Sequence, residues 1–308
     1  MHRTAQGVLA LATLLVVPTA GYAQAWLPPK GEGTLAVAFQ RVNANGHFLE
    51  DGSELPGYAT RASNGVFVLS YGITDRLAAT LTAPFVNVRY LGPDEPLNLP
   101  DNVLDDGGYH GALTDLRLEL RYGLLQRSLA VAPFVAAVVP SHDYDTLGEA
   151  AAGRGFQELH LGAQAGRLLD PVLPRGFLHA SYAYAFVRQD LDIPLNYSTL
   201  NAEAGYFVTP SLPVSFMWRR LWNHGGLSFN ELFVAPPEVF VNLDRVVRAS
   251  HEHVGIAVSI PLGESVSIHG DYLWFVSGKD AHYGSGFSFG VSWRFREAPS
   301  LFPGFPID

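Results

Sequence analysis

The feature that most constrains this chain is a strict two-residue alternation of charged and apolar side chains. Residues 115–122 read DLRLELRY, so each charged side chain is followed by an apolar one. Because successive side chains of a β-strand point to opposite faces, this segment has one apolar face and one charged face. In a soluble protein, a second sheet or helices would have to cover such apolar faces. The sequence shows no amphipathic helix beyond its first residues, whereas the alternation returns about a dozen times between turn signals. The pattern predicts an all-β fold, a transmembrane antiparallel up-and-down β-barrel of the bacterial outer-membrane type with about 12 strands.

The first residues resemble an export signal. A short positive start at Met1–Arg3 precedes an apolar run over residues 8–17, and the small residues Ala23 and Ala25 flank Gln24 at a cleavage site. The alternative, a membrane anchor, is disfavoured because the run is about half the ~20 residues that span a bilayer. We therefore predict that residues 1–25 are a signal peptide, cleaved after Ala23 or Ala25, and that the protein lies in the outer membrane of a Gram-negative bacterium. The absence of cysteine fits an exported protein, and a net charge of −9 argues against a nucleic-acid partner.

We expect residues 26–295 to form one barrel domain, because no linker separates two differently composed halves, and residues 296–308 to form a short periplasmic tail. The expected strands are residues 33–42, 62–71, 77–90, 112–123, 128–139, 156–168, 176–188, 197–208, 212–221, 246–260, 265–276 and 284–295. An even number of strands returns both termini to the periplasm. Ten or fourteen strands stay open as alternatives, because residues 222–245 contain the apolar piece SFNELFV, which would be either an extra strand extension or a folded plug.

The predicted connections alternate in length, as in bacterial outer-membrane barrels. Short turns follow the even-numbered strands, for example GITDR after Tyr71 and PLGE after Ile260, and long polar loops follow the odd-numbered ones. The long loops are predicted over residues 43–61, 91–111, 140–155 and 222–245. Short turns suit the periplasmic end of such a barrel, and long loops suit its outer end.

Aromatic side chains occupy the outward phase near the strand ends, where amphipathic rings suit the boundary between lipid and water. They are Tyr71, Tyr122, Tyr206, Trp218, Tyr272, Trp274 and Trp293. The last strand, GFSFGVSWRF at residues 286–295, places its aromatic residues on one face and resembles the C-terminal signal that the barrel assembly machinery recognises. Outer-membrane lipid and this machinery are therefore predicted partners. The residues that follow Phe295 depart from the usual pattern, in which the chain ends on the aromatic residue.

Four segments together resemble a known family. In order, AWLPPKGEGTLAVAFQ, SYGITDRLAATLTAPFV, GALTDLRLELRYGLL and VVPSHDYD are similar to the outer-membrane transporter family of the MetA type, named for the meta-pathway of phenol degradation. The resemblance covers most of the chain after the signal and implies a barrel that acts as a channel or transporter for small organic compounds. The chain departs from the family at residues 140–143, which read PSHD where members often carry Pro-Thr-Gly.

The inward phase of the strands carries the candidate functional residues, with both signs of charge in similar numbers. The pore-lining candidates are Asp115, Arg117, Glu119, Arg121, Glu158, His160, Glu203, Arg219, His251, His253, His269, Asp271 and Arg294, joined by Gln164 and His179. Separated rows of opposite charge in a water-filled lumen would create a transverse field that selects solutes. The alternative is an internal salt-bridge network that fills the barrel, since charges in a narrow interior pair or become costly. Twelve strands lie between the sizes at which barrels are packed shut and those that leave a channel.

The inward histidines admit a sharper hypothesis. His251 and His253 share a strand face and would bind zinc or copper if His269 or Asp271 on the next strand lay beside them. Polar lining of the lumen is the favoured interpretation, because strand pairs of histidine are far less specific than a metal-binding helix motif. The sequence therefore predicts no metal site and no cofactor.

A barrel-hosted lipid hydrolase is the rival functional class. His179 and Ser181 lie two residues apart and so share a face, as a base and a nucleophile must. The sequence places no clear Asn or acid to orient the base, although Glu203 on the next strand would be near. The phase argues against catalysis on lipid, because the pair points inward and not toward the membrane. We therefore expect no enzymatic activity. A structural or adhesive barrel that acts through its outer loops is the third alternative.

The sequence thus predicts an outer-membrane channel for passive passage of small-molecule solutes. We expect Arg117, Glu119, Arg121 and Arg219 to set its selectivity by their charges. A hydrophobic solute would need an apolar patch in the lumen, for which Val66, Val68, Phe134 and Met217 are the candidates.

Overall fold

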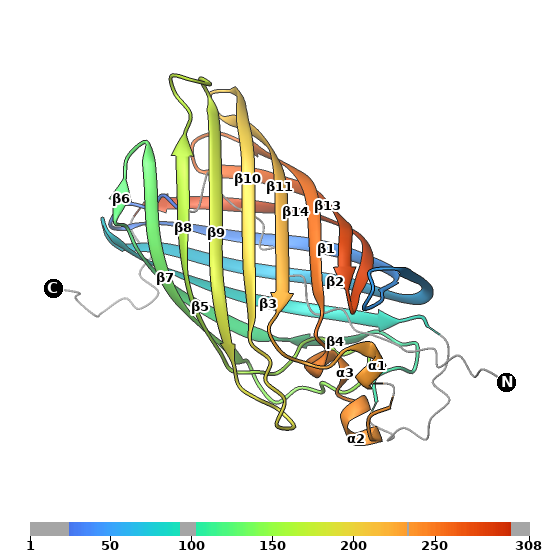
Figure 1. Ribbon diagram of the computed structural model, residues 1–308. Coiled ribbons are helices and arrows are strands. Elements are labelled where there is room, and N and C mark those ends of the chain that lie inside the picture. The colour runs from blue at the N-terminus through green and yellow to red at the C-terminus, as the bar shows by residue number, and fades with distance from the viewer. Residues whose placement is uncertain (1–24, 93–102, 233, 297–308) are drawn as a thin grey trace.

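The computed structural model describes residues 25–92, 103–232 and 234–296 as a closed barrel (Figure 1). The predicted signal peptide, apart from Ala25, and the predicted tail, apart from Arg296, lie outside these residues. The strands are β1 (Glu32–Phe48), β2 (Glu54–Thr74), β3 (Leu77–Tyr90), β4 (His110–Leu113), β5 (Asp115–Tyr122), β6 (Leu125–Gln126), β7 (Leu129–Pro140), β8 (Glu158–Leu168), β9 (Gly176–Val187), β10 (Tyr197–Thr209), β11 (Leu212–Asn223), β12 (Ser250–Pro261), β13 (Val266–Lys279) and β14 (Ala281–Arg296). Three short helices, α1 (Phe229–Leu232), α2 (Pro237–Phe240) and α3 (Leu243–Val246), lie between β11 and β12.

These strands occupy twelve positions in the wall. Both β4 and β5 pair with β3 and form one position interrupted at Thr114, while β6 is a short piece at the end of β7. The first and last strands pair along their length, from Glu32 opposite Arg296 to Phe48 opposite Ala281. The pairing of β2 with β3 completes the ring. The predicted twelve-stranded antiparallel barrel is therefore confirmed.

The outer surface of the wall is apolar, as the alternation predicts. Leu118 is 51% exposed and Phe289 is 57% exposed, whereas the inward Asn64 is fully buried and donates to Gln40 Oε1 at 2.9 Å. Backbone groups in lipid must be satisfied internally, and a closed ring of paired strands satisfies them. Phe295 is an exception on the outward phase, because its ring packs over Gly33 of the neighbouring strand. Among the described residues, no helix is long and apolar enough to cross a bilayer.

Connections at the two ends of the barrel differ in length. At one end, called the short-turn end, residues 75–76, 210–211 and 262–265 join neighbouring strands. At the other, called the long-loop end, residues 141–157 and 224–249 form long connections. Both the first strand and the last strand have their free termini at the short-turn end, as the even strand count predicts.

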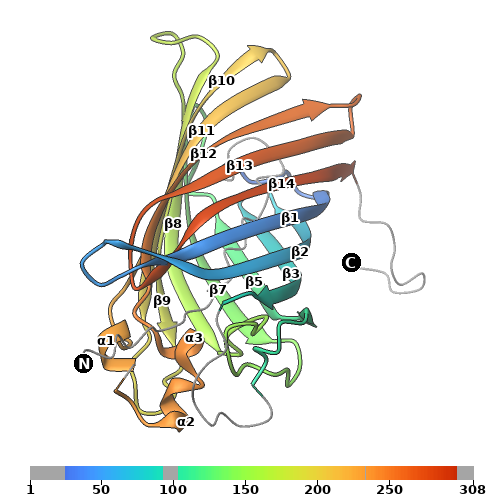
Figure 2. The same ribbon diagram turned by 90° about the vertical axis from the view of Figure 1, so that its right-hand side faces the viewer.

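The prediction of a long polar loop over residues 43–61 is wrong. Strands β1 and β2 continue pairing as far as Phe48 opposite Glu54 and leave only residues 49–53 as a turn (Figure 2). Asp280 alone separates β13 from β14. These strand ends extend past the alternating part of the sequence, where the apolar signal that marks a lipid-facing strand is lost.

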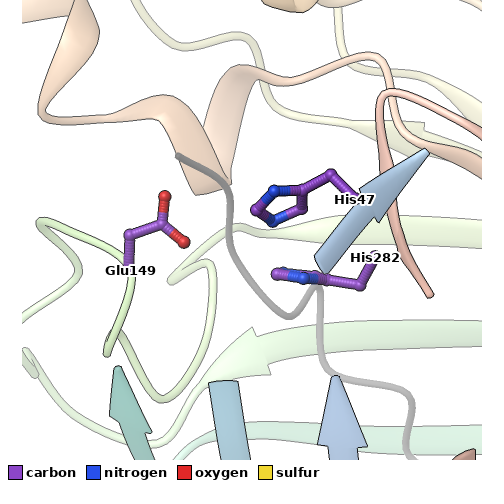
Figure 3. Close-up of side chains that lie close together, drawn as sticks. All are labelled: His47, Glu149 and His282. Atoms are coloured by element: carbon purple, nitrogen blue, oxygen red, sulfur yellow. The ribbon is translucent and has the colours of Figure 1, made fainter. Parts of the chain in front are cut away.

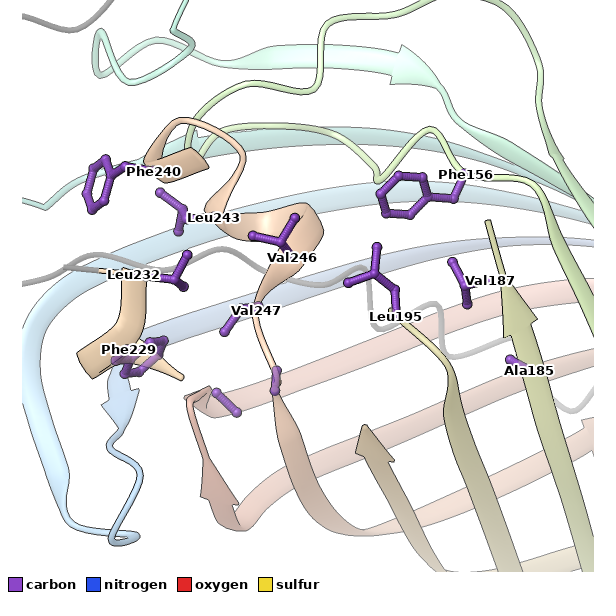
Figure 4. Packing of buried hydrophobic residues seen from close by; sticks show 12 residues of the cluster. Phe156, Ala185, Val187, Leu195, Phe229, Leu232, Phe240, Leu243, Val246 and Val247 are labelled. Atoms are coloured by element: carbon purple, nitrogen blue, oxygen red, sulfur yellow. The ribbon is translucent and has the colours of Figure 1, made fainter. Parts of the chain in front are cut away.

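The helical segment at residues 227–248, called here the plug, lies at the long-loop end of the barrel (Figure 1), and Figure 4 shows the packing of its buried side chains. Its apolar side chains belong to a buried cluster that also includes Val187 at the end of β9 and Ala281 at the start of β14. These two strands lie five positions apart in the sheet order, so the plug packs against well-separated parts of the wall. Of the two alternatives for SFNELFV, the folded plug is the correct one.

Polar contacts also tie the plug to other loops. The Arg245 Nη1 atom lies 2.7 Å from Asp190 Oδ2, and its Nε donates to the Arg154 carbonyl oxygen at 3.0 Å. Asn230 donates to Glu50 Oε2 at 3.0 Å in the β1–β2 turn. The plug is therefore held both by apolar burial and by connections to three neighbouring loops.

Candidate functional site

A continuous chain of charged side chains crosses one wall of the lumen. Arg117 Nη2 donates to Glu119 Oε2 at 2.6 Å, and Arg121 Nε lies 3.3 Å from the other oxygen of Glu119. Arg117 Nη1 also contacts His160 Nδ1 at 2.9 Å, and His160 Nε2 lies 2.7 Å from Glu158 Oε2. We call these five residues the lumenal charge chain. Each charge is paired with an opposite charge or a hydrogen-bonding partner, as charges in a partly buried lumen require.

Small side chains on the intervening strand make this chain possible. Ala136 of β7 lies between Glu119 of β5 and His160 of β8 in the register, and Val138 lies between Arg117 and Glu158. Alanine and valine do not reach far into the lumen, so the longer side chains on either side meet above them. The small side chains of β7, whose sequence is LAVAPFVAAVVP, are therefore as necessary for these contacts as the charged residues are.

The contacts of His160 determine its tautomer. An arginine side chain only donates hydrogen bonds, so His160 Nδ1 accepts from Arg117 and its Nε2 carries the proton. That Nε2–H donates to Glu158, whose Oε2 also accepts from the Tyr197 hydroxyl at 2.7 Å. Arg154 Nη1 approaches the other oxygen of Glu158 at 3.9 Å. His160 thus links the Arg117 guanidinium to the Glu158 carboxylate through its two ring nitrogens.

One end of β5 is tied to the loop at residues 141–157. The Tyr144 hydroxyl in this loop donates to Asp115 Oδ1 at 2.6 Å and accepts from the Gly155 backbone N–H at 2.9 Å. Burial and the adjacent Asp115 carboxylate raise the pKa of the Tyr144 hydroxyl above its usual range. The hydroxyl therefore stays protonated and remains a donor to Asp115.

A second group of charges faces the chain from β10, β11 and β13. Arg219 lies within electrostatic reach of Asp271 and Glu203. Its Nη2 also contacts the Met217 sulfur at 3.6 Å. On β13, His269 Nε2 lies 2.6 Å from Ser292 Oγ, and Asp271 accepts from the Ser288 hydroxyl. Both signs of charge thus occur on this side of the barrel as well.

Most of these groups surround a cavity of about 660 Å³ inside the barrel. Of the sequence-predicted candidates, the cavity is lined by Asp115, Arg117, Glu119, Arg121, Glu158, His160, Glu203, Arg219, His251, His253 and Arg294, together with Gln164 and His179. His269 and Asp271 lie outside this lining, against the serines of β14. Three of the four apolar candidates, Val68, Phe134 and Met217, also line the cavity, whereas Val66 does not.

The structure does not bring together the histidine cluster weighed for metal binding. In the β12–β13 register, His253 lies opposite Phe275, whereas His269 lies opposite Ser259 and Asp271 opposite Ala257. The alternation predicted which of these residues share a face, but it could not predict the register between β12 and β13. The His251–His253 pair is therefore separated from His269 and Asp271 along the barrel axis.

Sequence reasoning missed the segment that covers the short-turn end. Residues 25–31, called here the strap, run from β2 toward β8 and line the cavity with Trp26 and Pro28. The Trp26 indole Nε1 donates to the Arg127 carbonyl oxygen at 2.7 Å, and Lys30 N donates to Asp75 Oδ1 at 3.1 Å. The ring also packs on Gly166 of β8, where a Cβ atom would lie 2.3 Å from it. The glycine and the proline-rich start were visible in the sequence, but their contact needs the closed barrel.

Replacing Trp26 with alanine is expected to undock the strap. The ring is half-buried, and its loss removes apolar contact worth about 1–3 kcal/mol, which changes an equilibrium by about 5- to 150-fold. We expect trypsin to cleave after Lys30 at least about fivefold faster in folded protein, because local opening exposes the bond. Trp274→Ala, which removes an exposed ring from the outer wall, is the matched control and should leave this cleavage rate unchanged. Equal rates in the two variants would contradict the docking role of Trp26.

Comparisons with known proteins agree on the fold. No protein-family model and no curated protein matches the chain. An outer membrane channel from Pseudomonas putida F1 superposes with a TM-score of 0.70 at 14% sequence identity, over 89% of this chain and 99% of that one. The translocator domain of the autotransporter NalP from Neisseria meningitidis superposes with a TM-score of 0.52 at 10% identity, over 87% of this chain and 90% of that one. The chain therefore has the fold of bacterial outer-membrane barrels.

Proposed function

We propose that this protein is a gated channel of the Gram-negative outer membrane that passes small solutes. The observation that carries the proposal is the charged cavity of about 660 Å³ inside the barrel, which Trp26 and Pro28 of the strap line at one end. In this assignment the short-turn end is periplasmic and the long-loop end is extracellular, as in other barrels of this type. The structure of the Pseudomonas putida outer membrane channel supports the proposal through its shared fold.

The cavity lining favours small organic solutes with a polar or anionic group. The Arg117 guanidinium lies 5.8 Å from the centre of the Phe134 ring, so a cation and an apolar surface are adjacent. Val68 and Met217 extend the apolar part of the lining. A solute with an aromatic or aliphatic body would contact this part, while its polar group faces the lumenal charge chain. This substrate class agrees with the resemblance to the phenol-degradation transporter family, membership of which stays a prediction.

Single-channel recording under a salt gradient tests the proposal. Replacing Arg117 and Arg121 together with glutamine removes two positive charges from the lining and leaves Glu119 and Glu158 in place. The reversal potential is therefore expected to shift toward cation selectivity. Lys279→Gln removes an exposed cation outside the cavity lining and serves as the control. An unchanged reversal potential in the double variant would show that this row does not line the permeation path.

We propose no catalytic role for the lumenal His179 and Ser181. Their side chains line the cavity, and Glu203 lies directly opposite His179 in the register. Within the described residues, His179 Nε2 has no hydrogen-bond partner, which disfavours this nitrogen as a base for Ser181. Lipid in the surrounding bilayer is also on the opposite side of the wall. A lipolytic activity of the refolded barrel that Ser181→Ala abolishes would contradict this assignment.

A further inference from the structure

Three metal-binding side chains converge at the long-loop end, outside the lumenal charge chain. One ligand atom from each of His47, Glu149 and His282 lies within 4.8 Å of the other two (Figure 3). Their exposed fractions are 0%, 0% and 4%, respectively. The cluster lies at the rim of the barrel and beside the plug, since the His47 ring is 5.8 Å from the ring of Phe229 in α1.

The backbone positions the two histidines directly opposite each other. His47 of β1 pairs with His282 of β14, and their ring centroids are 4.6 Å apart. A β-bulge between Ala44 and Gly46 shifts the alternation of β1 by one residue. Such a shift re-aims the following side chains. His47 therefore faces inward although it is out of phase with the buried residues earlier in β1.

The third ligand comes from a distant loop that is itself fixed. Glu149 lies in the connection between β7 and β8, and its backbone N–H donates to Asp105 Oδ1 at 2.7 Å. The preceding Gly148 N–H donates to the Val241 carbonyl oxygen of the plug at 3.0 Å. The loop is thus anchored at Gly148 and at Glu149 itself, which holds Glu149 beside the histidines.

The donor set is that of a zinc site. Two imidazoles and one carboxylate bind Zn²⁺ at about 2.0–2.2 Å, which places tetrahedral ligand atoms about 3.4 Å apart. The observed limit of 4.8 Å is close enough for small side-chain rotations to close the difference. Nitrogen donors favour zinc and other transition ions over calcium or magnesium.

We propose that His47, Glu149 and His282 bind one Zn²⁺ ion. The ion would join the first strand, the last strand and the β7–β8 loop at one point. Because the same loop is hydrogen-bonded to the plug through Gly148, the ion would also strengthen closure of the long-loop end. This second consequence rests on the proposed channel function, whereas metal binding does not.

Zinc binding is measured on the refolded full barrel in detergent by competition with a chromophoric chelator. We expect one Zn²⁺ per chain with a Kd of about 1 µM or tighter. Glu149→Gln keeps the shape of the side chain but removes its charge, and His47→Ala with His282→Ala removes both imidazoles. The double variant is expected to lose at least about 100-fold in affinity, because even the loss of a hydrogen-bonding partner behind a ligand costs 10–100-fold. Heat-modifiable migration on gels identifies variants that still fold.

The matched control is His251→Ala with His253→Ala. These rings are 4.7 Å apart on one strand, but no third ligand group joins them within the described residues. The control is expected to keep the wild-type affinity and stoichiometry. Failure of the wild type to bind zinc, or equal binding by the wild type and the His47/His282 double variant, would overturn the proposal.

Conductance separates the two parts of the inference. Micromolar Zn²⁺ is expected to lower the open probability of wild-type channels and to leave Glu149→Gln channels unchanged. Zinc binding in detergent without any effect on conductance would overturn the closure role alone. A barrel that never conducts would contradict the channel function, while the chelator titration would still decide the metal site.

Discussion

Val246→Asp is expected to raise the open probability of the proposed channel strongly. Val246 is completely buried in α3, within the apolar cluster that holds the plug across the long-loop end. An unpaired carboxylate there loses its hydration or forces the cluster apart, and such substitutions commonly cost more than about 3 kcal/mol. Each 1.4 kcal/mol changes an equilibrium tenfold, so the ratio of open to closed plug should rise by about 100-fold or more.

The measurement is the open probability of single channels in a planar bilayer. The matched control is Val234→Asp, which introduces the same charge in the same segment at a side chain that is 84% exposed. Both variants should show the heat-modifiable migration of a folded barrel, because the wall is untouched. If Val246→Asp stays as closed as the control, the cluster does not gate the lumen and a different closure must be sought.

Glu119→Gln is expected to both destabilise the barrel and change its ion selectivity. Glu119 is 8% exposed and is the shared anion between Arg117 and Arg121. Without the charge of Glu119, the guanidinium groups of Arg117 and Arg121 remain close together and lose the carboxylate that both contact. Breaking a buried ion pair in this way typically costs about 3–5 kcal/mol. The free energy of unfolding in urea should fall by about that amount, and the reversal potential should shift toward anions.

The control for this change is Glu252→Gln. Glu252 Oε1 lies 3.1 Å from Arg220 Nη1, but half of the Arg220 side chain is exposed, so the pair contributes at most about 1 kcal/mol. The comparison distinguishes loss of a buried network from loss of any acidic side chain. Similar unfolding free energies for the two variants would mean that water reaches the lumenal charge chain and screens it.

The barrel itself was predictable from sequence because contact with lipid requires an apolar side chain at every second residue of a strand. This requirement acts within each strand, so the alternation in segments such as residues 115–122 identifies both the strand and its inward face. The signal fades where strands leave the apolar layer, which is why the outer halves of β1 and β2 were predicted as a loop. The plug was recognisable only as an apolar piece, since its partners Val187 and Ala281 are distant in the chain.

The lumenal site was predictable as a list of inward residues but not as a set of contacts. Which charges meet depends on strand register, and the small Ala136 of β7, between Glu119 and His160 in the register, leaves room for Arg117 to contact His160 across the intervening strand. The same dependence separated His253 from His269. His47 escaped prediction because it lies in residues 43–61, which were predicted as a loop, and because the bulge before it changes the phase of the strand. The strap escaped because Trp26 contacts Gly166 only after the ring has closed.

The closing seam between β1 and β14 has a consequence for how the barrel is made. It joins the two ends of the chain, so its formation carries the largest loop-closure cost among the neighbouring strand pairs. Hairpins between sequential strands form more readily, so the pairing of β1 with β14 is expected to form after the other strand pairs. His47 and His282 become neighbours only at that moment. A metal ion bound across them would therefore bind only to barrels that have closed. It would also oppose separation of β1 from β14, which would expose two unpaired strand edges.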